Sequence, residues 1–349
     1  MSVGLITHVD NPSLAEVTAL AQAAEAAGAD WLGLPDAFWW RDTWILAAEA
    51  ARVTRRLAVG PVVTNPYTRH PFVTLSALAT LQDLAGPRVV LGVGAGGSEI
   101  GGAAKISRAD APERTVELAG LIRRVAAGRP LDEESGRSLE VPLAPTRLLV
   151  GGRGARMLRA AGEVADEALL WAVPGSELAR TVDLVHQGSA RRRPELPGLG
   201  ITWAPLVEWG EASRALLRRA SAYAVLNNRD ETRERWRVGE DLVVRVRELL
   251  VAGDTDAAER LIPEAVAADL LTPRDVTTAA DVAREIRAGG IALPVIDVDE
   301  VEEQVAWARS VLAAAPTRPH PHTPPSPGAL KAARPGAAVT DRSIDGRRP

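Results

Sequence analysis

The stretch SVGLITHVDNPSLAEVTALAQAAEAAGADWLGL, residues 2–34, decides the fold class because it holds a strand, a helix and a second strand in order. The apolar run Val3–Thr7 predicts a buried strand. Ser13 is placed to cap the following helix, Glu16 completes a capping box, and Gly28 ends the helix. The apolar run that closes the stretch predicts the second strand. A helix between two strands is the unit from which parallel sheets are built.

The same alternation of short apolar runs and Ala- and Leu-rich helical stretches continues along the chain. Eight strands are predicted, a number that matches a closed barrel better than an open sheet. We therefore predict a (β/α)8 TIM barrel over residues 1–312. The segment Glu211–Gly290 is longer than one crossover and is predicted to be a helical insertion between strands seven and eight, acting as a lid or an oligomer surface. The predicted strands are Val3–Thr7, Trp31–Leu34, Leu57–Val63, Arg88–Val93, Arg147–Val150, Glu167–Trp171, Gly200–Leu206 and Leu293–Ile296.

Composition excludes several classes of protein. The chain has 349 residues, of which 46% are hydrophobic, so it can bury a large core. It has no cysteine, which excludes disulfides, thiolate nucleophiles and cysteine-ligated zinc, and its five histidines are scattered, so no metal site is predicted. A net charge of -4 with only short arginine runs argues against nucleic-acid binding.

The two ends of the chain carry different signals. The N-terminus lacks the basic and apolar segments of a secretory signal, and no apolar run is long enough to span a membrane, which predicts a cytoplasmic protein. Residues 313–349 are rich in proline and poor in apolar residues, which predicts a disordered tail.

Residues that follow the strands are the candidates for chemistry, because reacting groups in such barrels lie at the C-terminal ends of the strands. His8 follows the first strand and Asp36 the second, and either could contact substrate or transfer a proton. The alternative for Asp36 is a helix cap, and for His8 a structural role. Tryptophans near strand ends could form an apolar wall around a substrate, or belong to the core. They are Trp39, Trp40, Trp171 and Trp203.

Glycine-rich turns and one polar turn are the candidates for a cofactor. Gly151, Gly152, Arg153 and Gly154 precede a predicted helix, whose free N–H groups would favour a phosphate. The glycines after strand four could let a flat ring lie against the backbone, or only make a turn. The Thr-Asn-Pro run at residues 64–66 could hydrogen-bond the edge of a planar heterocycle, with a simple turn as the alternative.

A longer run carries a resemblance to a known family. Residues 60–71, GPVVTNPYTRHP, resemble the third-strand signature of methylenetetrahydromethanopterin reductase and related coenzyme F420-dependent enzymes of the luciferase-like type. Residues 86–96, GPRVVLGVGAG, resemble the fourth-strand region of that family, and residues 151–166, which begin GGRGARML, resemble its phosphate-binding turn and next helix. Together these motifs relate most of residues 1–310 to the family.

The resemblance implies a cofactor site. A non-prolyl cis peptide that supports the deazaflavin ring is expected at Val62–Val63, and Gly152, Arg153 and Gly154 are expected to hold the phosphate. The remaining residues implied to line the cofactor are Thr64, Asn65, Gly94 and Gly96. One departure concerns the substrate: methanogenic members have Asp-His after strand two, whereas this chain has Asp36-Ala37. The native substrate is therefore left open.

Three functions are compatible with these observations. The leading hypothesis is an oxidoreductase that exchanges a hydride between coenzyme F420 and an organic substrate at the barrel mouth. The second is an FMN-dependent monooxygenase that needs a separate flavin reductase, and oxygen consumption would separate the two. The third is a barrel that binds a flavin without turnover. The resemblance also implies a homodimer.

Overall fold

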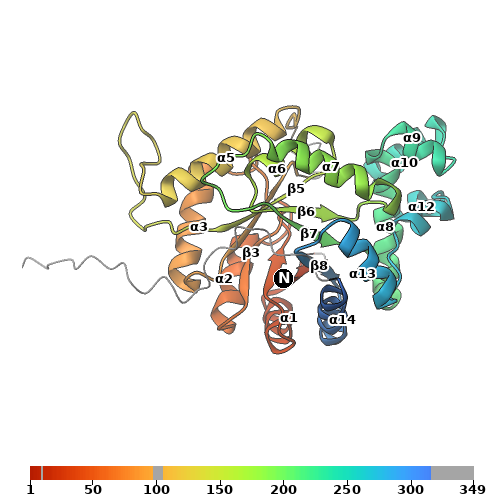
Figure 1. The fold of residues 1–349 in the computed structure, drawn as a ribbon, viewed down its shortest axis with the longest axis horizontal. Coiled ribbons are helices and arrows are strands. Elements are labelled where there is room, and N and C mark those ends of the chain that lie inside the picture. Colours follow the sequence, from red (N-terminus) through yellow and green to blue (C-terminus); the bar gives the residue numbers. More distant parts are fainter. Residues whose placement is uncertain (9–10, 97–104, 316–349) are drawn as a thin grey trace, which may run out of the picture.

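Parallel strands form the centre of the molecule. The computed structural model describes residues 1–8, 11–96 and 105–315. Eight strands lie in one sheet in the order β3-β2-β1-β8-β7-β6-β5-β4, and isolated bridges from Val59 to Val89 and from Thr64 to Val93 join its two edges. The sheet therefore closes as the predicted (β/α)8 barrel (Figure 1). The strands are β1 Ser2–Thr7, β2 Trp31–Leu34, β3 Ala58–Pro61, β4 Val90–Gly94, β5 Arg147–Gly151, β6 Glu167–Trp171, β7 Gly200–Ala204 and β8 Gly290–Val295.

Helices surround the barrel, as the alternating sequence predicts. The Ser13–Glu16 capping box opens the first helix, and Gly28 follows its end with a φ of 81°. The ring helices are α1 Leu14–Ala26, α2 Thr43–Val53, α3 Pro71–Ala85, α5 Ala111–Ala126, α6 Ala155–Val164, α7 Leu178–Ser189, α13 Val276–Glu285 and α14 Val301–Ala314. Short 3-10 turns, Gly175–Glu177 and Val298–Glu300, precede α7 and α14. The last helix includes two residues of the predicted tail, and the rest of that tail from residue 316 lies outside the described residues.

Two hydrophobic cores lie on opposite faces of the strands, because successive side chains of a strand point to opposite faces. The interior of the barrel is filled by residues such as Ile6, Leu149 and Ala204. The layer between strands and helices contains Ile201 and Trp203. Trp203 is 2% exposed in that outer layer, so the prediction that it lines the rim of the site is wrong.

The insertion between strands seven and eight is confirmed, and it packs around its own core. Its helices are α8 Glu211–Asn227, α9 Asp230–Arg235, α10 Glu240–Val251, α11 Thr255–Arg260 and α12 Glu264–Leu270. They gather at one side of the barrel (Figure 1). The buried Glu177, just before α7, connects the ring to the insertion: its carboxylate accepts hydrogen bonds from Arg229 at 3.0 Å and from Thr232 of α9 at 2.6 Å. Since α13 packs on α14 in the ring, the insertion ends before α13.

Strand ends differ from prediction where backbone geometry changes. β3 stops at Pro61, two residues before its predicted end, because the chain bulges at the next residues. β8 begins at Gly290, three residues before its predicted start, through pairing with β1. Within the described residues, no helix is long and apolar enough to cross a membrane.

Candidate functional site

The bulge after β3 forms the floor of the barrel mouth. The peptide Val62–Val63 is cis, as the resemblance implies. Between the two bridges to β4, the chain takes five steps from Val59 to Thr64 but only four on the partner strand, so one extra residue is accommodated. Thr64 restores the pairing: its N–H donates to the Gly92 carbonyl at 2.9 Å and its carbonyl accepts from Gly94 at 2.9 Å.

Glycines of neighbouring strands make room for the two valines of the bulge. A Cβ on Gly33 would lie 2.5 Å from the Val62 Cβ, and one on Gly92 would lie 3.0 Å from the Val62 Cα. A Cβ on Gly94 would approach the Val63 side chain to 3.2 Å. Val62 is buried in the barrel interior and Val63 is half-buried above it. The predicted cofactor residue Gly94 thus has a packing role beneath the mouth, and the exposed part of the floor is apolar.

Asp36 lies beside this floor and is held by a neighbouring strand. Its Oδ2 accepts a hydrogen bond of 2.6 Å from the Thr64 hydroxyl, so two predicted site residues contact each other. Burial raises the pKa of Asp36, and the nearby Asp42 carboxylate acts in the same direction. The Thr64 hydrogen bond and the Arg69 guanidinium, which pairs with Asp42, oppose that shift. The net effect favours the protonated carboxyl more than in an exposed aspartate.

Asn65 does not face the mouth as the resemblance implies. It is 2% exposed, and its Oδ1 accepts hydrogen bonds of 3.0 Å from the backbone N–H groups of Tyr67 and Thr68. Its Nδ2 donates to the Thr68 hydroxyl at 3.0 Å. Because its oxygen and one of its two Nδ2 N–H groups are engaged within their own loop, Asn65 shapes the turn after β3.

His8 and Trp171 meet at the mouth from strands one and six. Their rings stack with centroids 4.5 Å apart and planes 11° apart. The His8 backbone N–H continues the sheet by donating to Val295 at 2.8 Å, which orients the residue at the end of β1. Trp171 is half-buried between the barrel interior and the core of the insertion. The structure therefore brings together two residues that the sequence analysis proposed separately as site residues.

An aromatic surface follows β2. Phe38 and Trp39 are 51% and 45% exposed, and their rings meet edge to face at 4.9 Å. Trp40 lies a further 6.4 Å from Trp39, again edge to face. Large apolar side chains seldom stay exposed side by side without a binding role. Trp39 and Trp40 are thus available as the predicted apolar wall.

The turn after β5 has the properties of an anion site. α6 begins at Ala155 after Gly154, which provides no side-chain cap, so the first N–H groups of the helix stay free of a capping side chain. Arg153 Nη1 is buried and has no hydrogen-bond partner within the described part of the chain. Burial lowers the pKa of Arg153 to about 10. A half-buried cation whose buried Nη1 has no partner among the described residues, next to a helix N-terminus, is an arrangement that an anion would complete.

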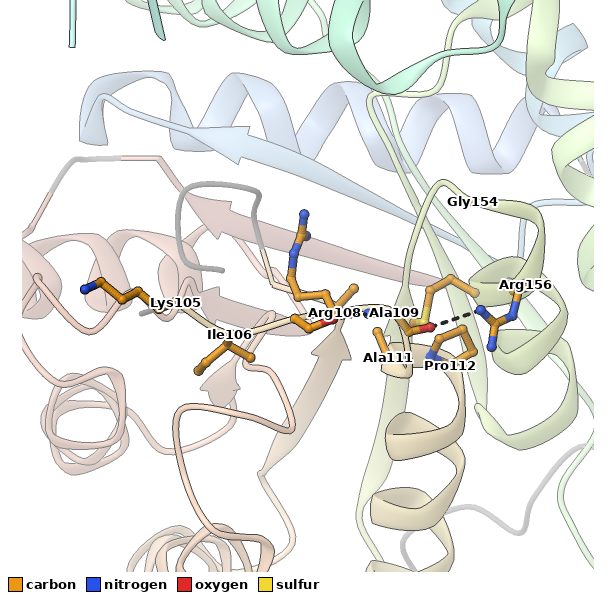
Figure 2. A pocket seen from close by; sticks show the side chains of 11 residues that line it. Lys105, Ile106, Arg108, Ala109, Ala111, Pro112, Gly154 and Arg156 are labelled. Atoms are coloured by element: carbon orange, nitrogen blue, oxygen red, sulfur yellow. Dashed lines mark hydrogen bonds between the residues drawn. The ribbon is translucent and has the colours of Figure 1, made fainter. Parts of the chain in front are cut away.

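A cavity of about 800 Å³ opens between this turn and residues 105–112. Figure 2 shows Gly154 and Arg156 on one side and Lys105 to Pro112 on the other, with Arg156 reaching the Ala109 carbonyl. Arg108 donates to the carbonyl of Gly96, a predicted cofactor residue whose φ is 73°, at 2.5 Å. Sequence reasoning missed Lys105, Arg108 and Arg156, because nothing in their local pattern shows that they face the β5 turn.

Known proteins resemble this chain in sequence and in fold. A family model for luciferase-like monooxygenase matches residues 1–293. The 5,10-methylenetetrahydromethanopterin reductase of Archaeoglobus fulgidus is 26% identical over 254 residues, which cover 70% of this chain and 76% of the relative.

Solved structures share the barrel. The coenzyme F420-dependent tetrahydromethanopterin reductase of Methanopyrus kandleri superposes with a TM-score of 0.70 at 20% identity, over 88% of this chain and 97% of that chain. The EDTA monooxygenase of Chelativorans sp. BNC1 superposes with a TM-score of 0.60 at 15% identity, over 91% and 95% of the two chains. At these identities the structural likeness concerns the fold.

Proposed function

Because the chain belongs to the luciferase-like monooxygenase family, we propose that it is an oxidoreductase that binds coenzyme F420 across the barrel mouth and exchanges a hydride with an organic substrate. The similarity to a methylenetetrahydromethanopterin reductase supports the choice of cofactor. The substrate is a separate question, since Ala37 follows Asp36 here. The family is one of enzymes, so the alternative of a flavin-binding barrel without turnover is not carried further.

The observation that carries the proposal is the anion site after β5. A phosphate bound there would accept hydrogen bonds from the first N–H groups of α6 and would give the buried Arg153 guanidinium a partner. Gly152 keeps the turn narrow, because a Cβ there would lie 2.7 Å from the Met157 Cβ. With Gly151 and Gly154 these residues fit the phosphate of a flavin-type cofactor.

Three side chains at the mouth, Val63, Trp39 and Trp40, would then serve the reaction. When bound, F420 supplies a ring that carries a hydride and does not activate oxygen. Val63 offers an apolar surface against which a flat ring can pack. Trp39 and Trp40 would hold an apolar substrate and exclude water.

Asp36 is our candidate for moving a proton. Its Oδ2 is occupied by the Thr64 hydroxyl, which leaves Oδ1 to carry the proton that the raised pKa favours. His8, stacked against Trp171, follows β1, the strand that neighbours β2, and is placed to contact substrate next to Asp36.

An FMN-dependent monooxygenase is the second candidate. The similarity in fold to a monooxygenase favours it, and the same anion site would hold the FMN phosphate. This function would require a separate flavin reductase as a partner and would consume oxygen.

The test is a titration of the purified protein with F420 and with FMN, followed by tryptophan fluorescence and cofactor absorbance. F420 binding without an FMN response supports the proposal. FMN binding alone, together with oxygen consumption when reduced FMN is supplied, would overturn it in favour of the monooxygenase.

We also propose that the chain forms a homodimer through the outer surface of α2 and α3, which pack on each other. Exposed apolar side chains lie on these two helices: Ile45 on α2, and Phe72, Val73 and Leu84 on α3. Such surfaces are typical of subunit contacts. Light scattering should give the mass of two chains, and Ile45→Glu should give one; a wild-type monomer at micromolar concentration would contradict the proposal.

A further inference from the structure

We propose that the pocket between helices α1 and α8 binds the apolar tail of the organic substrate, while the reacting end of that substrate lies at the barrel mouth beside His8. The inference rests on the proposed function and adds the chemical class of the substrate, an elongated apolar molecule whose tail is neutral or carries an amine. The pocket is lined by α1, α8 and the segments that follow β1 and β8, so it is separate from the anion site after β5.

Helix α8 carries apolar side chains on two faces, although one face is enough to attach it to the insertion. Leu217 and Ala220 are buried in the core of the insertion. Ala212, Ala215 and Leu216, which recur at helical spacing, line the pocket instead. A second apolar face that is not packed in a core is the kind of surface that binds a ligand.

The pocket exists because small side chains stand on both of its walls. Ala19 of α1 and Ala212 and Ala215 of α8 leave a space of about 540 Å³ between the two helices. Protein interiors are packed at high density, and voids of this size are uncommon in them. Sites for small molecules have mainly apolar walls and volumes of roughly 300–1,000 Å³. The pocket thus has the size and the lining of a site for an apolar molecule.

The charges at the rim of the pocket disfavour an acidic ligand. Among the described residues that line it, Glu16 and Asp297 are acidic and Arg219 is cationic. Hydrogen bonds from the Ser13 backbone and hydroxyl lower the pKa of Glu16, so this carboxylate stays charged at neutral pH. Asp297 is held in place by the Asp299 N–H, which donates to it at 3.0 Å. A carboxylate ligand would meet two fixed negative charges, whereas an alcohol or an ammonium group would not be repelled.

His8 connects the pocket to the barrel mouth. It is half-buried, it lines the pocket, and its ring stacks on Trp171 with centroids 4.5 Å apart. Trp171 packs against the cluster that fills the barrel interior, to which Val63 of the mouth also belongs. A molecule whose tail lies between α1 and α8 therefore has its other end at the mouth, where Asp36 follows the neighbouring strand β2.

The first experiment measures apolar binding without cofactor. Nile red is bound to the purified full-length protein and is displaced with hexanol, octanol and decanol, and then with octylamine and octanoate. We expect the affinity of the alcohols to rise about two- to fourfold per added methylene. Octylamine should bind about fivefold more tightly than octanoate, and added salt should reduce this difference.

Variants locate the binding. Ala215→Phe and Ala19→Leu fill the pocket from its two walls, and each should weaken octanol binding about tenfold. The matched control is Ala26→Leu, the same substitution at an exposed position of α1 that does not line the pocket, and it should bind octanol like wild type. Urea denaturation checks that all three variants are folded.

The second experiment tests the connection to the mouth. Octanol is added to the protein with bound F420, and the deazaflavin absorbance is followed. The absorbance should shift in wild type and in Ala26→Leu, because the end of the bound chain lies beside the cofactor. It should stay unchanged in Ala215→Phe at the same octanol concentration.

The outcomes separate the inference from the proposed function. Octanol binding that survives in Ala215→Phe and Ala19→Leu would overturn the inference, because the chain would then be bound elsewhere, and so would octanol binding without a shift of bound F420. If wild type binds no alcohol and Ala215→Phe changes the particle mass in light scattering, the pocket is a contact between copies and the inference is overturned. If F420 does not bind, the proposed function is overturned, while displacement of Nile red still decides whether the pocket takes an apolar chain.

Discussion

The two ends of strand β5 carry arginines in opposite situations. Arg147 begins the strand, and its guanidinium donates to Glu167 at 2.6 Å and to the Ser2 hydroxyl at 2.7 Å. Arg153 lies two residues beyond the other end of the strand, with Nη1 buried and without a partner among the described residues. The N-terminal end of β5, the lower end of the barrel, is thus completed by its own side chains, whereas we propose that a ligand completes the C-terminal, upper end.

The largest effect is expected from replacing Arg147 at the lower end of the barrel. Arg147→Met would leave the Glu167 carboxylate with Thr202 as its remaining side-chain partner, so we expect a loss of about 2–3 kcal/mol in the free energy of unfolding. Urea denaturation measures this loss. The exposed Arg129→Met should stay within about 0.5 kcal/mol of wild type. Equal stabilities for Arg147→Met and the control would show that the hydrogen bonds from Arg147 to Glu167 and Ser2 do not stabilise the fold.

The corresponding substitution at the upper end, Arg153→Met, should weaken cofactor binding and leave the free energy of unfolding intact. Arg153→Met removes a half-buried cation whose buried Nη1 has no partner in the described part of the chain, so the ligand-free protein should be as stable as wild type or more stable. Its affinity for phosphate-bearing cofactor should fall roughly 10–100-fold, since a hydrogen bond between charged groups is lost. Fluorescence titration checks this, and a deazaflavin riboside without phosphate is the control ligand. An unchanged affinity for F420 would remove Arg153 from the site.

Asp36 gives a smaller effect that depends on pH. Its pKa is raised in the folded protein, mainly by burial, so its stabilising contribution is complete below the ordinary aspartate pKa of about 3.9 and is lost as pH rises through the raised value. Asp36→Asn lacks this loss. Its stability relative to wild type should therefore improve as pH increases from 4 toward 8, roughly the range in which such carboxyls titrate, in parallel urea denaturations. A difference that stays constant with pH would contradict the raised pKa.

The smallest effect is expected at the aromatic surface. Trp39→Ala should leave stability within about 0.5 kcal/mol of wild type, because the side chain is largely exposed. The KM for an apolar substrate should rise about fivefold, and Trp39→Phe should restore most of it. An unchanged KM together with a loss of stability would show that Trp39 stabilises the fold and does not contact the substrate.

Local features were predictable from the residues alone. The Ser13–Glu16 capping box and the turn at Gly28 appear as expected, because both depend on neighbours within a few positions. The cis peptide at Val62–Val63 was predictable through a resemblance, which carries information that local propensity does not.

Side-chain direction was harder to predict. Trp203 and Trp171 both lie near strand ends, yet one faces the helix layer and the other the mouth, since a shift of one residue along a strand reverses the face. Asn65 was predicted to contact the cofactor because its amide can hydrogen-bond a heterocycle. In the structure that amide hydrogen-bonds Tyr67 and Thr68 of its own loop.

The sequence by itself determined the barrel, through its repeated strands and helices, and the family, through contiguous motifs that keep their spacing wherever the chain folds. Only the tertiary structure decided which charges are satisfied. Arg147 and Arg153 belong to the same segment, and Lys105 lies far from both in the chain, but a charge is paired or left unpaired by neighbours in space. Those neighbours come from strands that are distant in the sequence, and no local pattern specifies which of their side chains meet.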